Sequence, residues 1–210
     1  MVRQADSSGG AALVRGLPAW QLARRQRIVD AAVAALDEQD YEQIQIREVA
    51  QSGGVALGTL YRYFSSKEHL YAAVLDQWAA AGEALDTRCA DLDAVERIRA
   101  RVRWVIRAFE RWPRYHKLQT LLLNSPDPNV KELLDQFAES ATSWLVHDLA
   151  VLEPAEADDA ATMMWSIISS MLTRAIYRGR PMVDVYRVCD RFVDLLEPRL
   201  RAAQEAVHGG

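Results

Sequence analysis

Cysteine is scarce in this 210-residue sequence, and long apolar runs are missing. The two cysteines, Cys89 and Cys189, make neither a disulfide framework nor a CxxC metal site. No apolar stretch approaches the roughly 20 residues that cross a bilayer, and the N-terminus lacks the apolar core of a signal peptide. We therefore expect a reduced, cytoplasmic protein without a membrane partner.

Catalytic and metal-binding patterns are also missing. The sequence contains no phosphate-cradling glycine loop, no nucleophile elbow and no acidic pair in a recognisable catalytic frame. Cys189 is more simply interpreted as a small buried apolar residue than as a redox switch. The histidines have no spacing suited to zinc and are scattered at His69, His116, His147 and His208. We expect no enzyme, no metal site and no cofactor.

The net charge of -4 is unfavourable for binding nucleic acid, but the charge is unevenly distributed. Residues 1–70 hold eight basic and eight acidic side chains, and the acidic excess belongs to the remainder of the chain. The first 27 residues contain five arginines and one acid, Asp6. A neutral N-terminal unit with a basic edge is compatible with a surface that faces phosphate.

The N-terminal third predicts a mobile arm followed by short helices. Residues 1–17 are rich in Gly, Ser and Ala and lack periodicity. Apolar residues at helical spacing then predict a helix from Pro18 to about Asp37, with its arginines towards water. The segment IREVAQSGG predicts a second helix stopped by paired glycines, and Leu57–Tyr63 a third. Residues 18–66 therefore have the pattern of a helix-turn-helix unit.

Residues 67–210 predict only further helices, so the expected fold class is all-α. Helical apolar spacing recurs up to breaks at Pro113 and Pro154, and again over about 156–178 and 182–205. No segment has convincing strand alternation. We expect a three-helix helix-turn-helix domain followed by a larger helical domain.

The segment VALGTLYRYFSSKEHL combines an apolar side of a short helix with polar and aromatic side chains on the other side. Leu60 and Phe64 are four residues apart and should face inward, while Gly58 would allow close approach to a duplex. The remaining candidates suit contacts to thymine methyl groups, phosphates and sugars, and they are Ala56, Leu57, Thr59, Tyr61, Tyr63 and Lys67. The alternative is that these aromatic side chains simply belong to the core.

The longer segment IQIREVAQSGGVALGTLYRYFSSKEHL resembles the DNA-binding signature of TetR-type transcriptional regulators, densely over residues 24–75. The resemblance implies a homodimer that reads a near-palindromic operator, usually as a repressor, and releases it when a small ligand binds. By position, Arg47 and Ile46 fall where the supporting helix of the family meets phosphate. Tyr61, Tyr63 and Lys67 fall at backbone contacts of the family.

The resemblance assigns other positions of the segment to base contacts or leaves their role open. Ala56, Leu57 and Thr59 fall at the base-facing start of the recognition helix, and Arg62 points either to solvent or to phosphate. Leu57 departs from the small or polar residue frequent there, which would favour reading by methyl contacts and DNA shape. The resemblance also implies dimerisation through the last two helices, although burial within a monomer would explain their apolar faces equally well.

Bulky apolar residues in the C-terminal part suggest that a ligand bound there would be large and apolar. The candidate pocket residues are Trp104, Phe109, Trp112, Phe137, Trp144, Met164, Trp165 and Met171, with Met163 and Tyr177 beside them. Aromatic and methionine side chains at helical spacing often simply belong to the core of a domain and do not line a pocket. The sequence is also loosely similar to actinobacterial regulators of lipid and steroid breakdown, whose ligands are acyl- or steroid-CoA thioesters. A transcriptional activator, or a helical enzyme or lipid-binding protein, remains an alternative.

Overall fold

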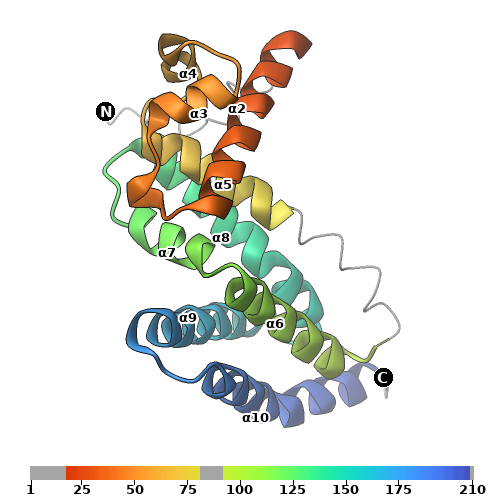
Figure 1. The fold of residues 1–210 in the computed structure, drawn as a ribbon. Coiled ribbons are helices and arrows are strands. Elements are labelled where there is room, and N and C mark those ends of the chain that lie inside the picture. Colours follow the sequence, from red (N-terminus) through yellow and green to blue (C-terminus); the bar gives the residue numbers. More distant parts are fainter. Residues whose placement is uncertain (1–17, 81–91, 209–210) are drawn as a thin grey trace, which may run out of the picture. The chain divides into compact units, whose positions relative to one another are not determined.

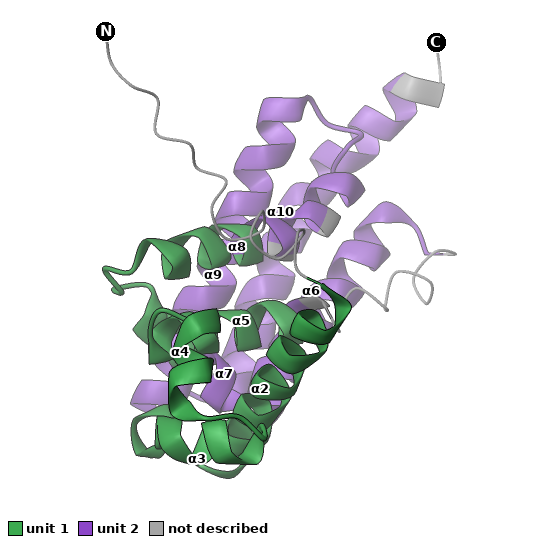
Figure 2. Cartoon of the chain, turned by 90° about the horizontal axis from the view of Figure 1, so that it is seen from above, with its two compact units in different colours: residues 1–78, 118–137 green, residues 79–117, 138–210 purple. Residues whose placement is uncertain are grey.

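The computed structural model describes residues 18–80 and 92–208, and in them it contains helices and no strand. The all-α prediction is thereby confirmed. The expected arm over residues 1–17 lies outside the described residues. The chain divides into two compact units (Figure 2), one of residues 1–78 and 118–137 and the other of residues 79–117 and 138–210. None of the described helices has the length and apolar character needed to cross a membrane.

Unit 1 is built on the N-terminal helices (Figure 1), which are α2 (Ala19–Glu38), the 3-10 turn η1 (Tyr41–Gln43), α3 (Ile46–Ser52), α4 (Leu57–Tyr63) and α5 (Lys67–Ala80). The predicted apolar stripe of α2 is buried at Ile28, Val29, Ala32 and Leu36. It packs against α3, which in turn packs against α4. The seven residues of α4 are too few to form a stable helix alone, so packing must hold this helix in place.

The two glycines between α3 and α4 are each required, but for different structural reasons. Gly54 has a φ of 66°, in the left-handed region where a side chain is strained. Gly53 instead lies against α2, since an added Cβ would be 3.3 Å from the Cα of Ile28 and 3.4 Å from the carbonyl oxygen of Arg27. The turn therefore allows both the change of chain direction and the close approach of α3 to α2.

Unit 2 contains α6 (Ala94–Arg111), the start of α7 (Pro113–Leu122), the end of α8 (Pro128–Asp148), α9 (Pro154–Arg178) and α10 (Met182–His208). The rest of α7 and α8 belongs to unit 1. Helix α10 packs against both α6 and α9 (Figure 1). Gly179 ends α9 in the left-handed conformation, as expected for a glycine after a helix.

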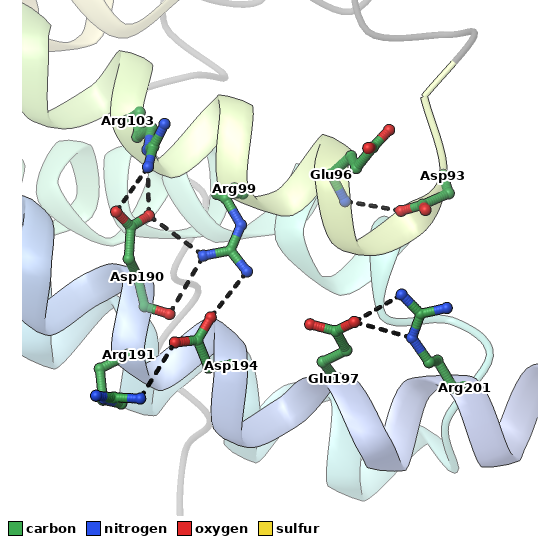
Figure 3. A network of polar contacts seen from close by, with 9 residues as sticks. All are labelled: Asp93, Glu96, Arg99, Arg103, Asp190, Arg191, Asp194, Glu197 and Arg201. Atoms are coloured by element: carbon green, nitrogen blue, oxygen red, sulfur yellow. Dashed lines mark hydrogen bonds and ion pairs between the residues drawn. The ribbon is translucent and has the colours of Figure 1, made fainter.

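Ion pairs join α6 to α10 along their exposed side (Figure 3). The guanidinium of Arg103 lies 2.8 Å from the Asp190 carboxylate, and that of Arg99 lies 2.9 Å from the Asp194 carboxylate. Inside the same unit, the fully buried Asp148 carboxylate lies 2.6 Å from Arg97. A buried carboxylate needs such partners because desolvation would otherwise be costly.

Candidate nucleic-acid interface

Helix α4 has a buried side and an exposed side, as the sequence predicts. Leu60 and Phe64 are completely buried, which confirms them as the residues that attach this helix to unit 1. The candidate DNA-contacting residues occupy the rest of the helix surface. Ala56, Gly58, Tyr61 and Arg62 are exposed, and Leu57, Thr59 and Tyr63 are half-buried. The Tyr61 side chain is 46% exposed, so its phenol is accessible to a ligand.

The preceding helix adds a basic side chain to this surface. Arg47 in the first turn of α3 is exposed, whereas Val49 and Ala50 of the same helix are buried. The connection to α4 is tightened by a hydrogen bond of 2.9 Å from the Val55 N–H to the Ala50 carbonyl. Unit 1 therefore presents two short helices joined by a tight turn, with the exposed Arg47 on the first and the exposed phenol of Tyr61 beside the half-buried Thr59 on the second.

Phe64, at the end of α4, is packed by side chains from two other helices. The guanidinium carbon of Arg25 lies 5.0 Å from the centre of the Phe64 ring, and the His69 ring meets it edge-on at 5.4 Å. Burial lowers the pKa of Arg25, although the nearby Asp76 opposes the shift. The expectation that Arg25 points to water is therefore wrong. Its flat cation instead stacks on the Phe64 ring at the end of α4.

Lys67, expected at a DNA backbone contact, has well-defined protein partners. Its ammonium donates hydrogen bonds to the carbonyls of Tyr41 at 2.6 Å and Ile44 at 2.8 Å, and lies 4.1 Å from the centre of the Tyr41 ring. An ammonium has three N–H donors, and these carbonyls use two. Lys67 thus attaches the start of α5 to the η1 turn. These two carbonyls leave the third N–H donor of its ammonium unused.

A polar cluster at the corner between α4 and α5 was not found from the sequence. The Asp127 carboxylate accepts hydrogen bonds from the hydroxyls of Ser65 and Ser66, both at 2.7 Å. Ser66 also caps α5, because its hydroxyl accepts a hydrogen bond of 3.0 Å from the His69 N–H. Asp127 lies in the segment NSPDPN, where Asp before Pro is a recognisable helix start, although the sequence does not indicate its partners.

The candidate ligand-binding residues fall into different environments. Phe109, Met164 and Met171 are buried in unit 2, and Phe137 is buried in unit 1. Trp165 is half-buried. Trp104 and Trp112 are exposed at the surface of unit 2, where Arg111 lies over the Trp112 ring. The Trp144 side chain is outside the described residues.

Metal and redox chemistry find no support in the part of the chain that is described. Over residues 18–80 and 92–208, no group of three or more His, Cys, Asp or Glu side chains is arranged to hold a metal ion. Cys189 is completely buried, and burial raises the pKa of its thiol to about 12. A thiol that is neither exposed nor ionised is a poor nucleophile, which agrees with its interpretation as an apolar core residue.

Comparison with known proteins identifies a family match for the segment that contains α3 and α4. Residues 28–74 match the family model described as bacterial regulatory proteins, tetR family. The chain is 31% identical over 180 residues to the HTH-type transcriptional repressor KstR of Rhodococcus jostii strain RHA1, covering 84% of each protein. The matched range contains α3, α4 and the start of α5, where the exposed candidates lie.

Solved structures show a similar fold. A TetR transcriptional regulator from Rhodococcus sp. RHA1 matches with a TM-score of 0.72 at 23% identity, covering 84% of this chain and 97% of that one. The FadR transcriptional regulator of Bacillus subtilis, in complex with stearoyl-CoA, matches with a TM-score of 0.63 at 19% identity, covering 81% of this chain and 96% of that one. At these identities the likeness concerns the fold.

Proposed function

The chain belongs to the TetR family of bacterial transcriptional regulators, and we propose that it is a repressor that binds a near-palindromic operator as a homodimer. The observation that carries the proposal is the outward surface of α4, where Thr59, Tyr61 and Arg62 surround the exposed Gly58. The name of the similar Rhodococcus jostii protein, a transcriptional repressor, supports repression rather than activation. Binding to DNA in turn implies a cytoplasmic location.

Recognition would combine phosphate contacts with apolar base contacts. Arg47 and Tyr61 are exposed on neighbouring helices and can donate hydrogen bonds to phosphate oxygens on the two sides of a groove. Ala56 and Leu57 offer only apolar contact, which suits the methyl group of thymine. Such contacts discriminate less than bidentate hydrogen bonds, so the shape of the DNA should contribute to operator choice.

Dimerisation would use α9 and α10, as the family resemblance implies. Helix α9 exposes Met163, Ser166, Ser170 and Tyr177, which recur at helical spacing on one side of the helix. Helix α10 exposes Val183 and Leu195, with about 70% of each side chain accessible. An isologous contact through these surfaces would give the two recognition helices the two-fold symmetry of a palindromic site.

The effector would be a large apolar molecule such as an acyl- or steroid-CoA thioester. The Bacillus subtilis FadR structure, which has a similar fold, contains stearoyl-CoA. Buried Phe109, Met164 and Met171 supply apolar surface in unit 2 that suits such a ligand. Because allosteric linkage is reciprocal, an effector that weakens DNA binding must itself bind more weakly to the DNA-bound protein.

The first experiment measures binding to the DNA upstream of the protein's own gene by fluorescence anisotropy. We expect clear preference over a scrambled duplex at moderate salt, with affinity that falls as salt rises because phosphate contacts release counterions. Tyr61→Ala should weaken binding about tenfold, the equivalent of about 1.4 kcal/mol. Trp112→Ala is the matched control, since it removes an exposed aromatic side chain of unit 2.

Two results would contradict this proposal. Binding without preference over the scrambled duplex would remove specific recognition. A Tyr61→Ala variant that loses thermal stability in proportion to its loss of affinity would mean that Tyr61 serves the core and not DNA.

A further inference from the structure

We propose that Asp127 is a positioning residue for DNA recognition, which from the start of α8 holds the corner between α4 and α5 and thereby orients the recognition helix. The inference rests on the proposed function, because it assumes that α4 reads DNA. It concerns a residue that lies 62 positions beyond Ser65 and outside the segment matched by the family model.

The two oxygens of the Asp127 carboxylate have separate roles. One accepts the hydroxyl hydrogen bonds of Ser65 and Ser66. The other accepts two bonds of 3.0 Å from Asn129, one from its backbone N–H and one from its side-chain amide. The first set ties the carboxylate to the α4–α5 corner, and the second fixes it at the start of α8. A single side chain therefore joins the N-terminal ends of two helices.

The Asn129 amide strengthens the same connection. Besides its bond to Asp127, it donates a hydrogen bond of 3.2 Å to the Ser65 hydroxyl. Burial alone would raise the pKa of Asp127, but the hydrogen bonds from Ser65, Ser66 and Asn129 outweigh burial and lower the pKa to about 2. The carboxylate is thus ionised at neutral pH, and it lies where the dipoles of α5 and α8 both favour negative charge.

The corner held by Asp127 is directly continuous with the recognition helix. Phe64 is the C-cap residue of α4 and Ser65 follows it in the chain. The Ser65 N–H donates a hydrogen bond of 3.1 Å to Nδ1 of His69, whose ring meets the Phe64 ring edge-on. A displacement of Ser65 would therefore pass to Phe64 through the backbone and through the His69 ring. Since α4 has only seven residues, its orientation depends on these end contacts.

If Asp127 acted only through its charge, its removal would have the opposite effect on the affinity for DNA. Asp127 is an anion within the unit that would approach DNA, so its removal should strengthen attraction to phosphate if charge were its only effect. A weaker complex after its removal would therefore indicate lost positioning.

The test compares Asp127→Ala with Asp93→Ala in the full-length protein, by anisotropy with the operator duplex at a temperature where circular dichroism shows all variants folded. Asp93 is the N-cap residue of α6 in unit 2, where its carboxylate accepts a hydrogen bond of 2.8 Å from the Glu96 N–H (Figure 3). Each substitution removes one helix-capping aspartate and lowers stability for that reason. We expect Asp127→Ala to weaken operator binding at least tenfold and Asp93→Ala to change it less than twofold.

A double-mutant cycle with Ser65→Ala tests the connection itself. If the Ser65–Asp127 bond carries the effect, the double variant should bind no more weakly than Asp127→Ala alone. Wild-type affinity in Asp127→Ala, equal losses in Asp127→Ala and Asp93→Ala, or full additivity in the cycle would each overturn the inference. These results leave operator binding by the wild type intact, whereas a wild type without sequence preference would overturn the proposed function together with this inference.

Discussion

At the scale of single residues, the outer surface of α4 combines a residue without a side chain, Gly58, with the hydroxyl-bearing Thr59 and Tyr61 that follow it, as the proposed contact with DNA requires. Gly58 is the second residue of α4, where glycine is unfavourable relative to alanine by up to the value of about 1 kcal/mol found in helix interiors. A Cβ added at Gly58 would have no atom within 4 Å. Folding therefore gives no reason for glycine here, whereas close approach to a groove does.

Gly58→Ala should consequently move stability and DNA affinity in opposite directions. We expect a melting temperature a few degrees higher, because alanine favours the helix by up to about 1 kcal/mol. We also expect weaker operator binding by anisotropy, because the methyl group stands between the helix and the duplex. Gly53→Ala is the contrasting variant, since its Cβ would press on the backbone of α2 and should lower stability. Unchanged affinity in Gly58→Ala would contradict a DNA-facing role for this position.

At the scale of elements, the sequence located the breaks between helices better than their first residues. Pro113 and Pro154 were used as stops, yet each is the first residue of the helix that follows, α7 and α9. Proline suits this position because its missing N–H would have no helical partner there. The helix predicted over about 156–178 begins two residues late because the polar first turn of α9 gives no periodic signal, whereas the predicted start at residue 182 agrees with α10.

Helices α7 and α9 are joined by a buried histidine. Nε2 of His116 lies 3.0 Å from the hydroxyl of Thr173. That hydroxyl donates its own proton to the Ser169 carbonyl at 2.8 Å, so it accepts from His116 and assigns the proton to Nε2. The ring also meets Phe109 edge-on at 5.4 Å. Burial in this environment lowers the pKa of His116 to about 4.

This contact predicts loss of stability in mild acid. An unfolded histidine has a pKa near 6.5, so between about pH 6.5 and 4 the unfolded chain binds a proton that the folded chain does not. The free energy of unfolding should therefore fall as the pH is lowered through this window, by up to about 3 kcal/mol from His116. Urea denaturation at a series of pH values measures it.

His116→Gln is the control for this pH dependence. The pKa of His69 is also lowered, mainly by burial, and contributes in the same direction. The difference between the wild type and His116→Gln therefore isolates His116. A pH dependence that is unchanged in His116→Gln would mean that His116 does not titrate in this window.

At the scale of the whole molecule, the residues proposed for DNA binding and those proposed for dimerisation lie in different units. The candidate DNA-contacting side chains lie in unit 1, and α9 and α10 lie wholly in unit 2. The sequence predicts a DNA-binding domain that ends at residue 66. Unit 1 extends further, to Trp78, and includes residues 118–137 from much later in the chain. Unit 1 therefore combines segments that are distant in the sequence.

Dimerisation through unit 2 can be tested by placing a charge on its exposed apolar surface. Leu195→Glu on α10 should increase the monomer fraction in sedimentation velocity experiments, because burying the carboxylate in a two-fold contact is unfavourable twice. Leu123→Glu provides the matched control, since Leu123 is a similarly exposed leucine outside α9 and α10. Equal dimerisation in both variants would place the dimer contact elsewhere.

The sequence by itself determined the helical fold class, the breaks between helices and the two sides of α4, because helical period and turn residues are local properties of the chain. Only the tertiary structure decided which side chains meet. It brings Lys67 onto carbonyls 23 and 26 positions earlier, Arg25 onto Phe64, and Asp127 onto a serine 62 positions away. It also exposes Trp104 and Trp112, whose apolar character suggested a buried pocket. Such contacts depend on how separate helices pack, and local periodicity does not encode the partner that faces each side chain.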